Sequence, residues 1–375
     1  MKWELKTLNQ LGFVGRGKSR HRPRNATHLY GGIYPLIQTG DIQKANFFLN
    51  NYSQTYSEEG LAQSKLWKEG TMVISIVGAN TAETAILGFD ACFPDSVIGF
   101  IPDKTKADVK FVKYNFECLK IHLKGISEGT ARENLSLEKL LSVNIPTPPL
   151  PTQRKIASIL SAYDDLLENN LKRIKLLEEQ TFLKYKGIVR SENLEAFTIE
   201  DLANVVMGQS PKSDTYTDEK DNLPFHQGVT NFSNYFVAHK IYCKSPIKIA
   251  ESGDILFSVR APVGRINFTT DRICIGRGLC AFRSKKGFQN YLYHQLKEFF
   301  FAEDVIGNGA IFNAVTKVEL MNVKLKTPNE KIQKEFEIEA RQIYDLILNL
   351  TKQNAKLREA RDILLPKLMN GQIAV

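Results

Sequence analysis

Two long stretches of the chain place apolar residues at every third or fourth position, the spacing of one face of an α-helix. Residues 151–191 contain no proline after Pro151 and no glycine before Gly187. At ~1.5 Å per residue, some thirty helical residues extend roughly 50 Å, so each stretch predicts a spacer helix. The apolar positions are Ile156, Leu160, Tyr163, Leu167, Ile174 and Leu177 in residues 151–191, and Phe336, Ala340, Ile343, Ile347, Leu350, Leu357 and Leu364 in residues 333–370.

The two stretches are related by an offset of 180 positions, which also holds upstream. The matched pairs include Asp165 with Asp345, Leu177 with Leu357, Gly129 with Gly309, Leu135 with Val315, and Thr147-Pro148 with Thr327-Pro328. This domain-sized period indicates duplication of a globular segment followed by a long helix. We expect globular domains at residues 1–150 and 192–330, a central helix at 151–191 and a C-terminal helix at 331–375.

Each long helix has an apolar stripe that must be buried, and antiparallel pairing of the two gives a consistent register. With Leu167 opposite Leu357, nearly every layer is apolar, and Tyr163 stacks on Arg361. Asn170 and Asn354 share one layer, where each satisfies the other, so we predict a contact between their side chains. The predicted coiled-coil residues are Leu160, Leu167, Asn170, Ile174, Leu177, Ile347, Leu350, Asn354, Leu357 and Leu364.

The globular segments mix short strands with helices. Strands are expected at residues 34–42, 72–77, 85–89, 97–101 and 274–282, and helices at 111–121, 135–141 and 291–301. The expected fold class is therefore α/β (mixed α+β), with two duplicated globular domains separated by two long helices that pair as an antiparallel coiled coil.

The formal net charge of +9 and the pI near 9.1 favour an anionic partner. No apolar run approaches a membrane span, and the N-terminus does not resemble a signal peptide. The five cysteines are scattered without a C-x-x-C pair, as expected of thiols in a reducing cytoplasm. The chain has no Gly-rich dinucleotide fingerprint, H-E-x-x-H or G-x-S-x-G motif and no metal-binding pattern, so a binding protein without a cofactor is the default expectation.

Residues 12–19 satisfy the Walker A spacing G-x-x-x-x-G-K-S, so a nucleotide-hydrolysing enzyme is one alternative. A P-loop needs a buried strand before it and a helix after it, whereas here a short polar segment precedes the motif and RHRPR follows it. The same basic loop suits phosphates and guanine edges, because the arginine fork bonds two acceptors at once. Its candidate DNA-binding residues are Arg16, Lys18, Ser19, Arg20, His21, Arg22, Arg24 and Asn25.

Polar residues elsewhere suit contacts with DNA, although each is also an ordinary surface residue when taken alone. Gln38-Thr39 and His226-Gln227 lie at the ends of equivalent predicted strands. Arg260 and Arg277 are followed by small residues, which would let a ligand approach the backbone closely. These candidates are Gln38, Thr39, His226, Gln227, Arg260 and Arg277, together with Lys212 in the polar loop of the second segment.

The chain resembles the specificity (S) subunits of type I restriction–modification systems over essentially its whole length. The resemblance rests on PPLPTQRKIASILSAYDDLLENN, on the ending LREARDILLPKLMNGQI, and on motifs of two target recognition domains. These motifs are RGKSRHRPRN, YPLIQTGDI, GLAQSKLW (with the further candidate DNA-binding residues Ser64 and Lys65) and CFPDSVIGF in the first domain, and GQSP, LPFHQG, GDILFSVRAPVG and CIGRGL in the second. The second helix departs from the first at its start, where NEKIQKEFEIEA replaces LPTQRKIASIL.

The resemblance implies a cytoplasmic, non-catalytic subunit that reads a bipartite, asymmetric site in double-stranded DNA. It implies two modification subunits that bind S-adenosylmethionine and methylate adenine, and restriction subunits that use ATP and Mg. One turn of B-DNA is ~34–36 Å, so a roughly 50 Å spacer suits half-sites about a turn apart. The outer faces of the helices, with Arg154, Lys155, Asp164 and Glu168, are candidates for docking the modification subunits. A coiled-coil scaffold that never binds DNA is the remaining alternative.

Overall fold

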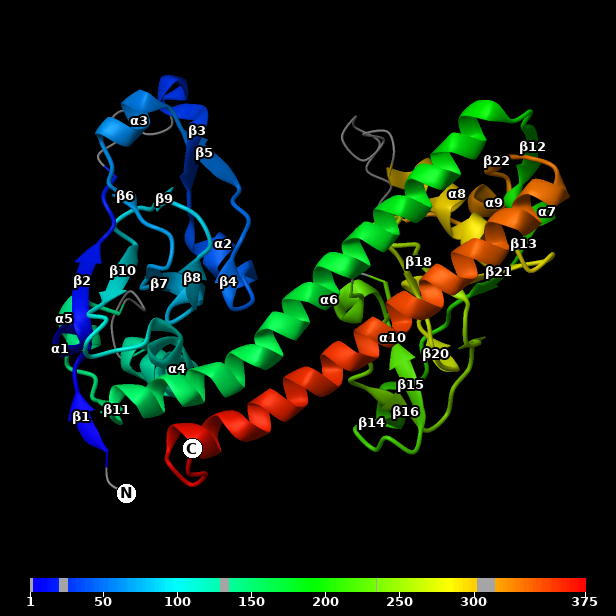
Figure 1. The fold of residues 1–375 in the computed structure, drawn as a ribbon. Helices are drawn as coiled ribbons and strands as arrows, with labels where there is room; N and C mark the ends of the chain where they lie inside the picture. The colour runs from blue at the N-terminus through cyan, green and yellow to red at the C-terminus, as the bar shows by residue number, and fades with distance from the viewer. Residues whose placement is uncertain (1–2, 20–25, 129–134, 234, 302–313) are drawn as a thin grey trace. The chain divides into compact units, whose positions relative to one another are not determined.

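The computed structural model describes residues 3–19, 26–128, 135–233, 235–301 and 314–375. The chain forms two compact units: unit 1 comprises Met1–Leu171 and Lys352–Val375, and unit 2 comprises Lys172–Thr351. Two long helices, α6 (Leu150–Ser191) and α10 (Glu330–Met369), each contribute one half to each unit (Figure 1).

Unit 1 contains two main sheets, a two-stranded sheet β1-β11 and a covering helix. The five-stranded sheet has the order β2-β10-β7-β8-β4, and the four-stranded sheet has the order β5-β3-β9-β6. Helix α4 packs against the larger sheet and buries Phe111, Val112 and Phe116 in the unit's core. The strands are β1 (Glu4–Lys6), β2 (Gly12–Arg16), β3 (Tyr30–Leu36), β4 (Phe48–Leu49), β5 (Gln54–Tyr56), β6 (Leu66–Trp67), β7 (Met72–Ser75), β8 (Thr84–Leu87), β9 (Ala91–Cys92), β10 (Val97–Pro102) and β11 (Ile145–Thr147). The helices are α1 (Leu8–Leu11), α2 (Thr39–Lys44), α3 (Glu58–Ala62), α4 (Val109–Glu128) and α5 (Leu137–Leu141), with 3-10 turns η1 (Thr27–Leu29) and η2 (Gly78–Asn80).

Unit 2 repeats this framework. Its sheets have the orders β13-β21-β18-β19, β14-β16-β15-β20-β17 and β12-β22. The strands are β12 (Glu195–Thr198), β13 (Ala203–Met207), β14 (Tyr216–Thr217), β15 (Leu223–His226), β16 (Tyr242–Cys243), β17 (Ile249–Ala250), β18 (Ile255–Ser258), β19 (Ile266–Phe268), β20 (Ile273–Ile275), β21 (Leu279–Ser284) and β22 (Lys324–Thr327). The helices are α7 (Ile199–Leu202), α8 (Gln289–Phe301) and α9 (Lys317–Met321), with 3-10 turns η3 (Ser213–Thr215) and η4 (Val229–Asn231).

The offset between equivalent elements changes along the chain. Helices α5 and α9 begin at 137 and 317, an offset of 180, whereas β2 and β13 begin at 12 and 203, an offset of 191. The segments between these landmarks therefore differ in length, while the strand order around them is kept. Equivalent parallel pairs lie inside one sheet of each unit: β3 with β9 in the four-stranded sheet of unit 1, and β15 with β20 in the five-stranded sheet of unit 2.

The long helices run antiparallel within each unit. In unit 1, the Asn170 Nδ2 atom donates to Asn354 Oδ1 at 2.9 Å, which confirms the predicted contact. In unit 2, Ile174, Ile347 and Leu350 are buried together, and Lys184 pairs with Glu339 near the end of the helix pair. The second helix keeps the geometry of the first despite its different start, since Gln153 donates to the Pro148 carbonyl and Gln333 to the Pro328 carbonyl, both at 2.9 Å.

The fold class is confirmed, with two corrections to the predicted strands. The predicted strand at residues 34–42 ends at Leu36, and helix α2 follows, because Gln38 and Asp41 form a capping box at its start. The predicted strand at residues 274–282 is two strands, β20 and β21, separated by the turn Gly276-Arg277-Gly278.

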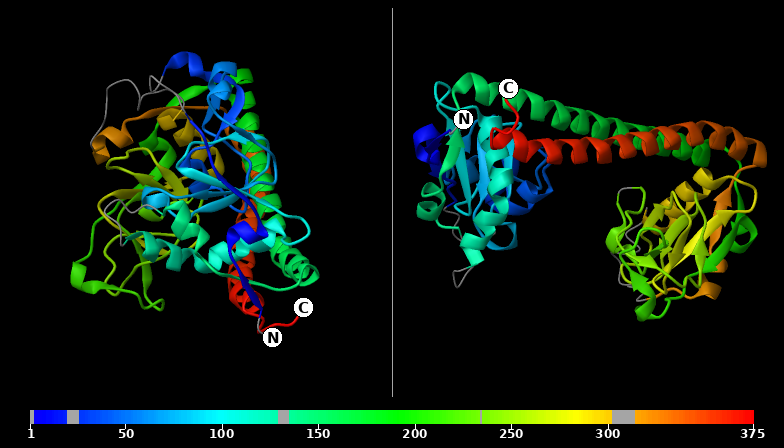
Figure 2. Two further views of the ribbon diagram at one scale, coloured as in Figure 1. Left: turned by 90° about the vertical axis from the view of Figure 1, so that its left-hand side faces the viewer. Right: turned by 90° about the horizontal axis from the view of Figure 1, so that it is seen from below.

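Both ends of the chain belong to unit 1 (Figure 2). Trp3 and Val375 pack against the core of this unit. In the described part of the chain, no helix combines the length and the hydropathy needed to cross a bilayer.

Candidate nucleic-acid interface

Three loops of unit 2 meet beside the carboxyl end of β15. The loop after β13 is held by the Gly208 and Gln209 amides, which donate to the Leu279 and Ile275 carbonyls at 2.9 and 3.0 Å. The loop after β20 is held by the Gly276 amide, which donates to the His226 carbonyl at 2.8 Å. These backbone bonds bring residues 208–210, Gln227 and residues 276–278 together, and we call this set the unit 2 loop cluster.

Glycines permit the close approach of these loops. A Cβ on Gly208 would lie 2.1 Å from the Gly276 carbonyl oxygen, and one on Gly278 would lie 2.5 Å from the Gln227 carbonyl oxygen. Both distances are far below van der Waals contact with rigid backbone, so these positions require glycine. The motifs GQSP and GRG are thus explained by packing around Gln227.

Three candidate cations of unit 2, Lys212, Arg260 and Arg277, are exposed, and none forms an ion pair with a described carboxylate. Arg277 lies in the loop cluster itself, and Lys212 follows the GQSP segment. Arg260 follows β18 and its backbone bridges to Ala314. Unpaired arginines and lysines of this kind are available to an anionic ligand.

His226 is a correction, because its imidazole is only 1% exposed instead of facing a base edge. Its Nε2 atom lies 2.9 Å from His239 Nδ1, and His239 Nε2 lies 3.0 Å from Asp271 Oδ2. Burial, together with the neighbouring His239, lowers the pKa of His226 to about 4, so the ring is neutral at pH 7. His226 therefore anchors the end of β15 beneath Gln227, whose side chain is exposed.

Unit 1 builds an equivalent cluster from the loops after β2, β3 and β9. The Gly17 amide donates to the Val97 carbonyl at 2.9 Å, and the Lys18 amide donates to the Phe93 carbonyl at 3.0 Å. A Cβ on Gly17 would lie 2.2 Å from the Pro94 carbonyl oxygen, so this position also requires glycine. Gln38 occupies the place of Gln227, directly beyond the strand that pairs in parallel with its neighbour.

The cations of the unit 1 cluster are Arg16, Lys18 and Lys65, all exposed and without an ion pair to a described carboxylate. The Lys65 ammonium lies 3.8 Å from the centre of the Trp67 ring, a cation–π contact that fixes its position. Ser64 donates its hydroxyl to the Lys18 carbonyl at 2.7 Å and so positions the basic loop. The predicted Arg20, His21, Arg22, Arg24 and Asn25 lie outside the described residues.

Gln38, Ser19 and Thr39 are half-buried. The Gln38 Nε2 atom donates to Gln54 Oε1 at 3.3 Å, and Asn80 donates to the Thr39 hydroxyl at 3.5 Å. The side chains of Gln38 and Thr39 are thus engaged at the rim of the cluster, and that of Gln38 also takes part in the capping box of α2.

The geometry of the described residues does not favour the Walker A alternative. Gly12 begins β2, which pairs antiparallel with β10 at the edge of its sheet, and Lys18 and Ser19 lie in an extended loop. A P-loop requires a helix whose first turn binds phosphate, and no helix begins among the described residues that directly follow Gly17.

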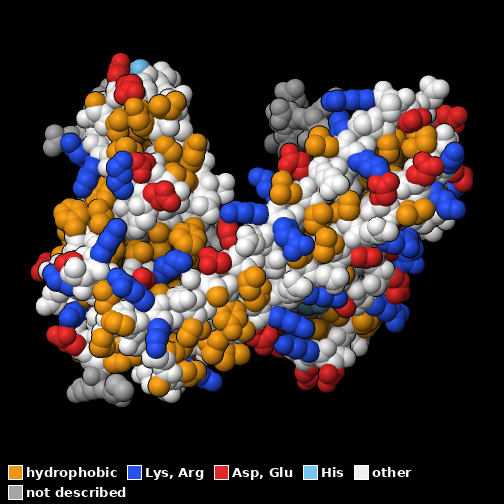
Figure 3. All heavy atoms as spheres, in the orientation of Figure 1, with side chains coloured by type: hydrophobic (Ala, Val, Ile, Leu, Met, Phe, Trp, Pro, Cys, Tyr) orange, Lys and Arg blue, Asp and Glu red, His pale blue; other side chains and the backbone are white. Residues whose placement is uncertain are grey.

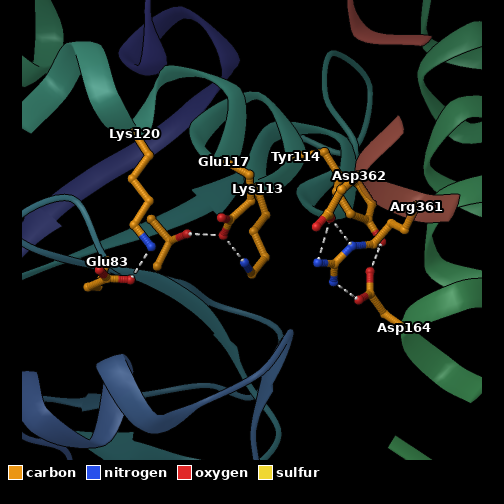
Figure 4. Close-up of polar contacts among 9 residues, drawn as sticks. Glu83, Lys113, Tyr114, Glu117, Lys120, Asp164, Arg361 and Asp362 are labelled. Atoms are coloured by element: carbon orange, nitrogen blue, oxygen red, sulfur yellow. Dashed lines mark hydrogen bonds and ion pairs between the residues drawn. The ribbon is translucent and has the colours of Figure 1, made fainter. Parts of the chain in front are cut away.

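Asp164 is a second correction, since it is buried instead of facing outward for docking. It accepts from the Tyr114 hydroxyl at 2.5 Å and pairs with Arg361 Nη1 at 2.5 Å (Figure 4). Arg361 therefore bonds carboxylates, Asp164 and Asp362, instead of stacking on Tyr163 as predicted. Glu168 accepts from Asn50 at 3.1 Å, whereas Arg154 and Lys155 are exposed.

A further polar cluster lies between α4 and the unit 1 sheet (Figure 4). Lys113, which is 2% exposed, pairs with Glu117 at 2.6 Å, and Lys120 pairs with Glu83 at 2.5 Å. Burial opposes ionisation of Glu117, but Lys113 and Lys120 outweigh it and lower the pKa of that carboxyl. These charges are mutually satisfied, so the cluster is structural.

The described residues contain no group of three or more His, Cys, Asp or Glu side chains that could hold a metal ion. Figure 3 shows, on one face of the molecule, lysine and arginine side chains interspersed with aspartate and glutamate in each unit. The excess positive charge therefore does not by itself locate a binding face, and the loop clusters are defined by their geometry.

Comparison with known proteins agrees with this architecture. Residues 1–179 and 191–357 each match the family described as type I restriction modification DNA specificity domain. The chain belongs to this family. It is a type I restriction–modification S subunit, and neither the scaffold nor the nucleotide-hydrolysing alternative is favoured.

Two relatives of this S subunit come from Methanocaldococcus jannaschii. The putative type I restriction enzyme MjaX specificity subunit is 30% identical over 298 residues, covering 73% of this chain and 70% of the relative. The type I restriction enzyme MjaIX specificity subunit is 23% identical over 419 residues, covering 100% of this chain and 94% of the relative.

The S subunit of the type I restriction–modification system from M. genitalium shares the fold. Its crystal structure superposes with a TM-score of 0.65 at 17% identity, covering 98% of this chain and 96% of that one.

Two residues of the unit 2 site, Ser210 and His239, were not predicted from the sequence of this S subunit. Ser210 in GQSP is equivalent to the predicted Ser19 in RGKS, and this equivalence could have identified it.

Proposed function

We propose that this S subunit reads a bipartite, asymmetric site in double-stranded DNA, with one half read by each loop cluster. The observation that carries the proposal is the repetition of the cluster. In both units, a glycine-dependent loop, a glutamine beyond a central strand and unpaired cations converge, while the side chains differ. Two similar surfaces with different side chains suit two different half-sites.

The residue types in the loop clusters suit the two kinds of contact found at protein–DNA interfaces, those with phosphates and those with base edges. Lysine and arginine supply phosphate contacts, which position the protein, and amide or guanidinium groups read base edges. Arg16, Lys18 and Lys65 would serve the first half-site, and Lys212, Arg260 and Arg277 the second. Gln38 and Gln227 lie among them and offer amides to the bases.

The long helices offer a repeated surface to partner subunits. Leu166 (51% exposed) and Ile363 (52%) in unit 1 have counterparts 180 positions away in unit 2, namely Leu346 (36%) and Leu183 (61%). Exposed leucine and isoleucine at matched positions favour a docking partner over a solvated face. The partners proposed are two modification subunits, one per unit, that bind S-adenosylmethionine and methylate adenine, and through them restriction subunits that use ATP and Mg. The chain itself acts by binding.

The test is DNA affinity of the S subunit assembled with its modification subunits, measured across a salt series. Neutralising Arg260 and Arg277, or Arg16 and Lys18, should weaken binding and reduce the magnitude of the salt slope by roughly 0.9 per lost phosphate contact. Lys104→Ala is the matched control, because Lys104 is exposed and lies beyond the opposite end of β10 from the loop cluster.

Unchanged affinity and slope in both double variants would contradict the assignment of the loop clusters. A wild-type complex without DNA affinity at low salt would restore the scaffold alternative.

A further inference from the structure

The side chain of Gln227 is oriented by a serine of a different loop. The Ser210 hydroxyl donates to Gln227 Oε1 at 2.7 Å, and the Arg277 backbone amide donates to the Ser210 oxygen at 3.2 Å. A hydroxyl has one hydrogen, so Ser210 accepts from the Arg277 loop while it donates to the Gln227 amide. A single serine therefore connects all three loops of the unit 2 cluster.

The surrounding backbone limits the rotation of the Gln227 side chain. A Cβ on Gly276 would lie 2.5 Å from Gln227 Oε1, which shows that the carboxamide rests directly against this glycine. Below it, His226 is fixed by His239, and the Gln227 carbonyl accepts from the Gly278 amide at 3.2 Å. The residue is held from three sides, while its side chain stays exposed.

We infer that Ser210 is a positioning residue that presents the Gln227 amide group to DNA as a hydrogen-bond donor. With its oxygen occupied by the Ser210 hydroxyl, Gln227 turns its two N–H donors outward. In the major groove these donors match base edges that present acceptors, above all guanine, with its O6 and N7 atoms. The exposed Arg277 of the same cluster favours guanine for the same reason.

The equivalent glutamine of unit 1 is held differently. Gln38 donates its Nε2 group to Gln54 at 3.3 Å, and its side chain also takes part in the capping box at the start of α2. The two glutamines thus occupy equivalent places with different hydrogen-bond partners. The role inferred for Ser210 is therefore confined to unit 2 and to one half of the recognition site.

This inference rests on the proposed function, and one experiment separates the two. The S subunit is co-expressed with its modification subunits, and methylated adenines are mapped over a random DNA library. For the wild type, the proposed function requires a bipartite motif, and the inference requires a position in the unit 2 half that selects an acceptor-bearing base. Ser210→Ala should relax discrimination at that position roughly five- to tenfold and leave the other half unchanged.

Three further variants make the result specific. Ser210→Thr retains the hydroxyl and should keep the motif, while Gln227→Ala should relax the same position as Ser210→Ala. Ser213→Ala is the control, because Ser213 is exposed in the adjoining turn and its hydroxyl has no described partner. Thermal unfolding of each complex shows whether any loss reflects folding.

A wild type without a bipartite motif would overturn the proposed function. A wild-type motif that Ser210→Ala leaves unchanged would overturn the inference alone. Relaxation at different positions in Ser210→Ala and Gln227→Ala would also overturn the inference.

Discussion

At the scale of single residues, two histidines of unit 2 are kept neutral by burial. Burial, with a smaller contribution from Lys297, lowers the pKa of His294 to about 3, and the Tyr344 hydroxyl lies 3.0 Å from its Nε2 atom. The pKa of His226 is lowered to about 4 by burial and by His239, which itself contacts Asp271. Both rings pack where a proton is unfavourable, so acid should destabilise unit 2.

The direction in which stability changes with pH follows from the histidine pKa values in the folded and unfolded states. An unfolded histidine has a pKa near 6.5, so below that pH the unfolded chain binds protons that the folded chain rejects. Stability is fully present above about pH 7 and falls as the pH drops from about 6.5. Between pH 7 and 5.5 the two residues together should remove about 2 kcal/mol of unfolding free energy.

Urea unfolding of the chain at these two pH values measures the loss. The double variant His226→Gln/His294→Gln should flatten the pH dependence, whereas His122→Gln, an exposed histidine on α4, should preserve it. Equal pH dependence in the wild type and the double variant would show that other groups control the acid response.

Among single residues, the exposed cations could be predicted from the sequence, whereas residues positioned by distant contacts could not. The cations Arg16, Lys18, Lys212, Arg260 and Arg277 could be identified from the sequence, because arginine and lysine that are followed by glycine, serine or alanine in a loop seldom lie in a core. The burial of His226 could not be predicted from the sequence, because it depends on His239 and Asp271. These residues are 13 and 45 positions away, and only the folded sheet brings them together with His226. Ser64 and Ser210 likewise act through loops distant in sequence.

At the scale of elements, the long helices could be predicted because their apolar residues recur at a regular helical spacing along the sequence. The 4-3-4 spacing fixed both the helices and their register, down to Asn170 and Asn354. Short strands were harder, since two or three residues carry little periodicity. The capping box of α2 and the GRG turn overrode the apolar pattern of residues 34–42 and 274–282.

The asparagine layer makes a testable prediction about the coiled coil. Asn170 is 7% exposed and Asn354 is 2% exposed, so Asn354→Leu would leave a buried amide without its partner. The cost should be about 1–3 kcal/mol of unfolding free energy, measured by urea unfolding. Restoring an apolar layer with Asn170→Leu/Asn354→Leu should recover most of that loss.

The control is Leu350→Asn, which places an amide opposite the apolar Ile174 in unit 2 and should destabilise that unit without a compensating partner. If Asn354→Leu left stability unchanged, the hydrogen bond would contribute nothing beyond packing.

At the scale of the whole molecule, the chain is one framework used twice. The strand order, the glycine-dependent loops and the parallel central pair recur, while the recognition side chains diverge. A constant framework with variable loops is how a fixed scaffold acquires new specificity. The duplication could be predicted from the sequence offset alone. The convergence of three loops on Gln38 in unit 1, and of three on Gln227 in unit 2, could not be predicted, because it depends on the order of strands in the sheets.

The central claim is that each unit reads its own half of one DNA site. The direct measurement is an exchange of residues 1–150 for those of another S subunit, followed by co-expression with the modification subunits and mapping of methylated adenines. We predict that one half of the bipartite motif changes while the other half and the number of base pairs between them stay the same. A change in both halves, or methylation without sequence preference, would contradict the account.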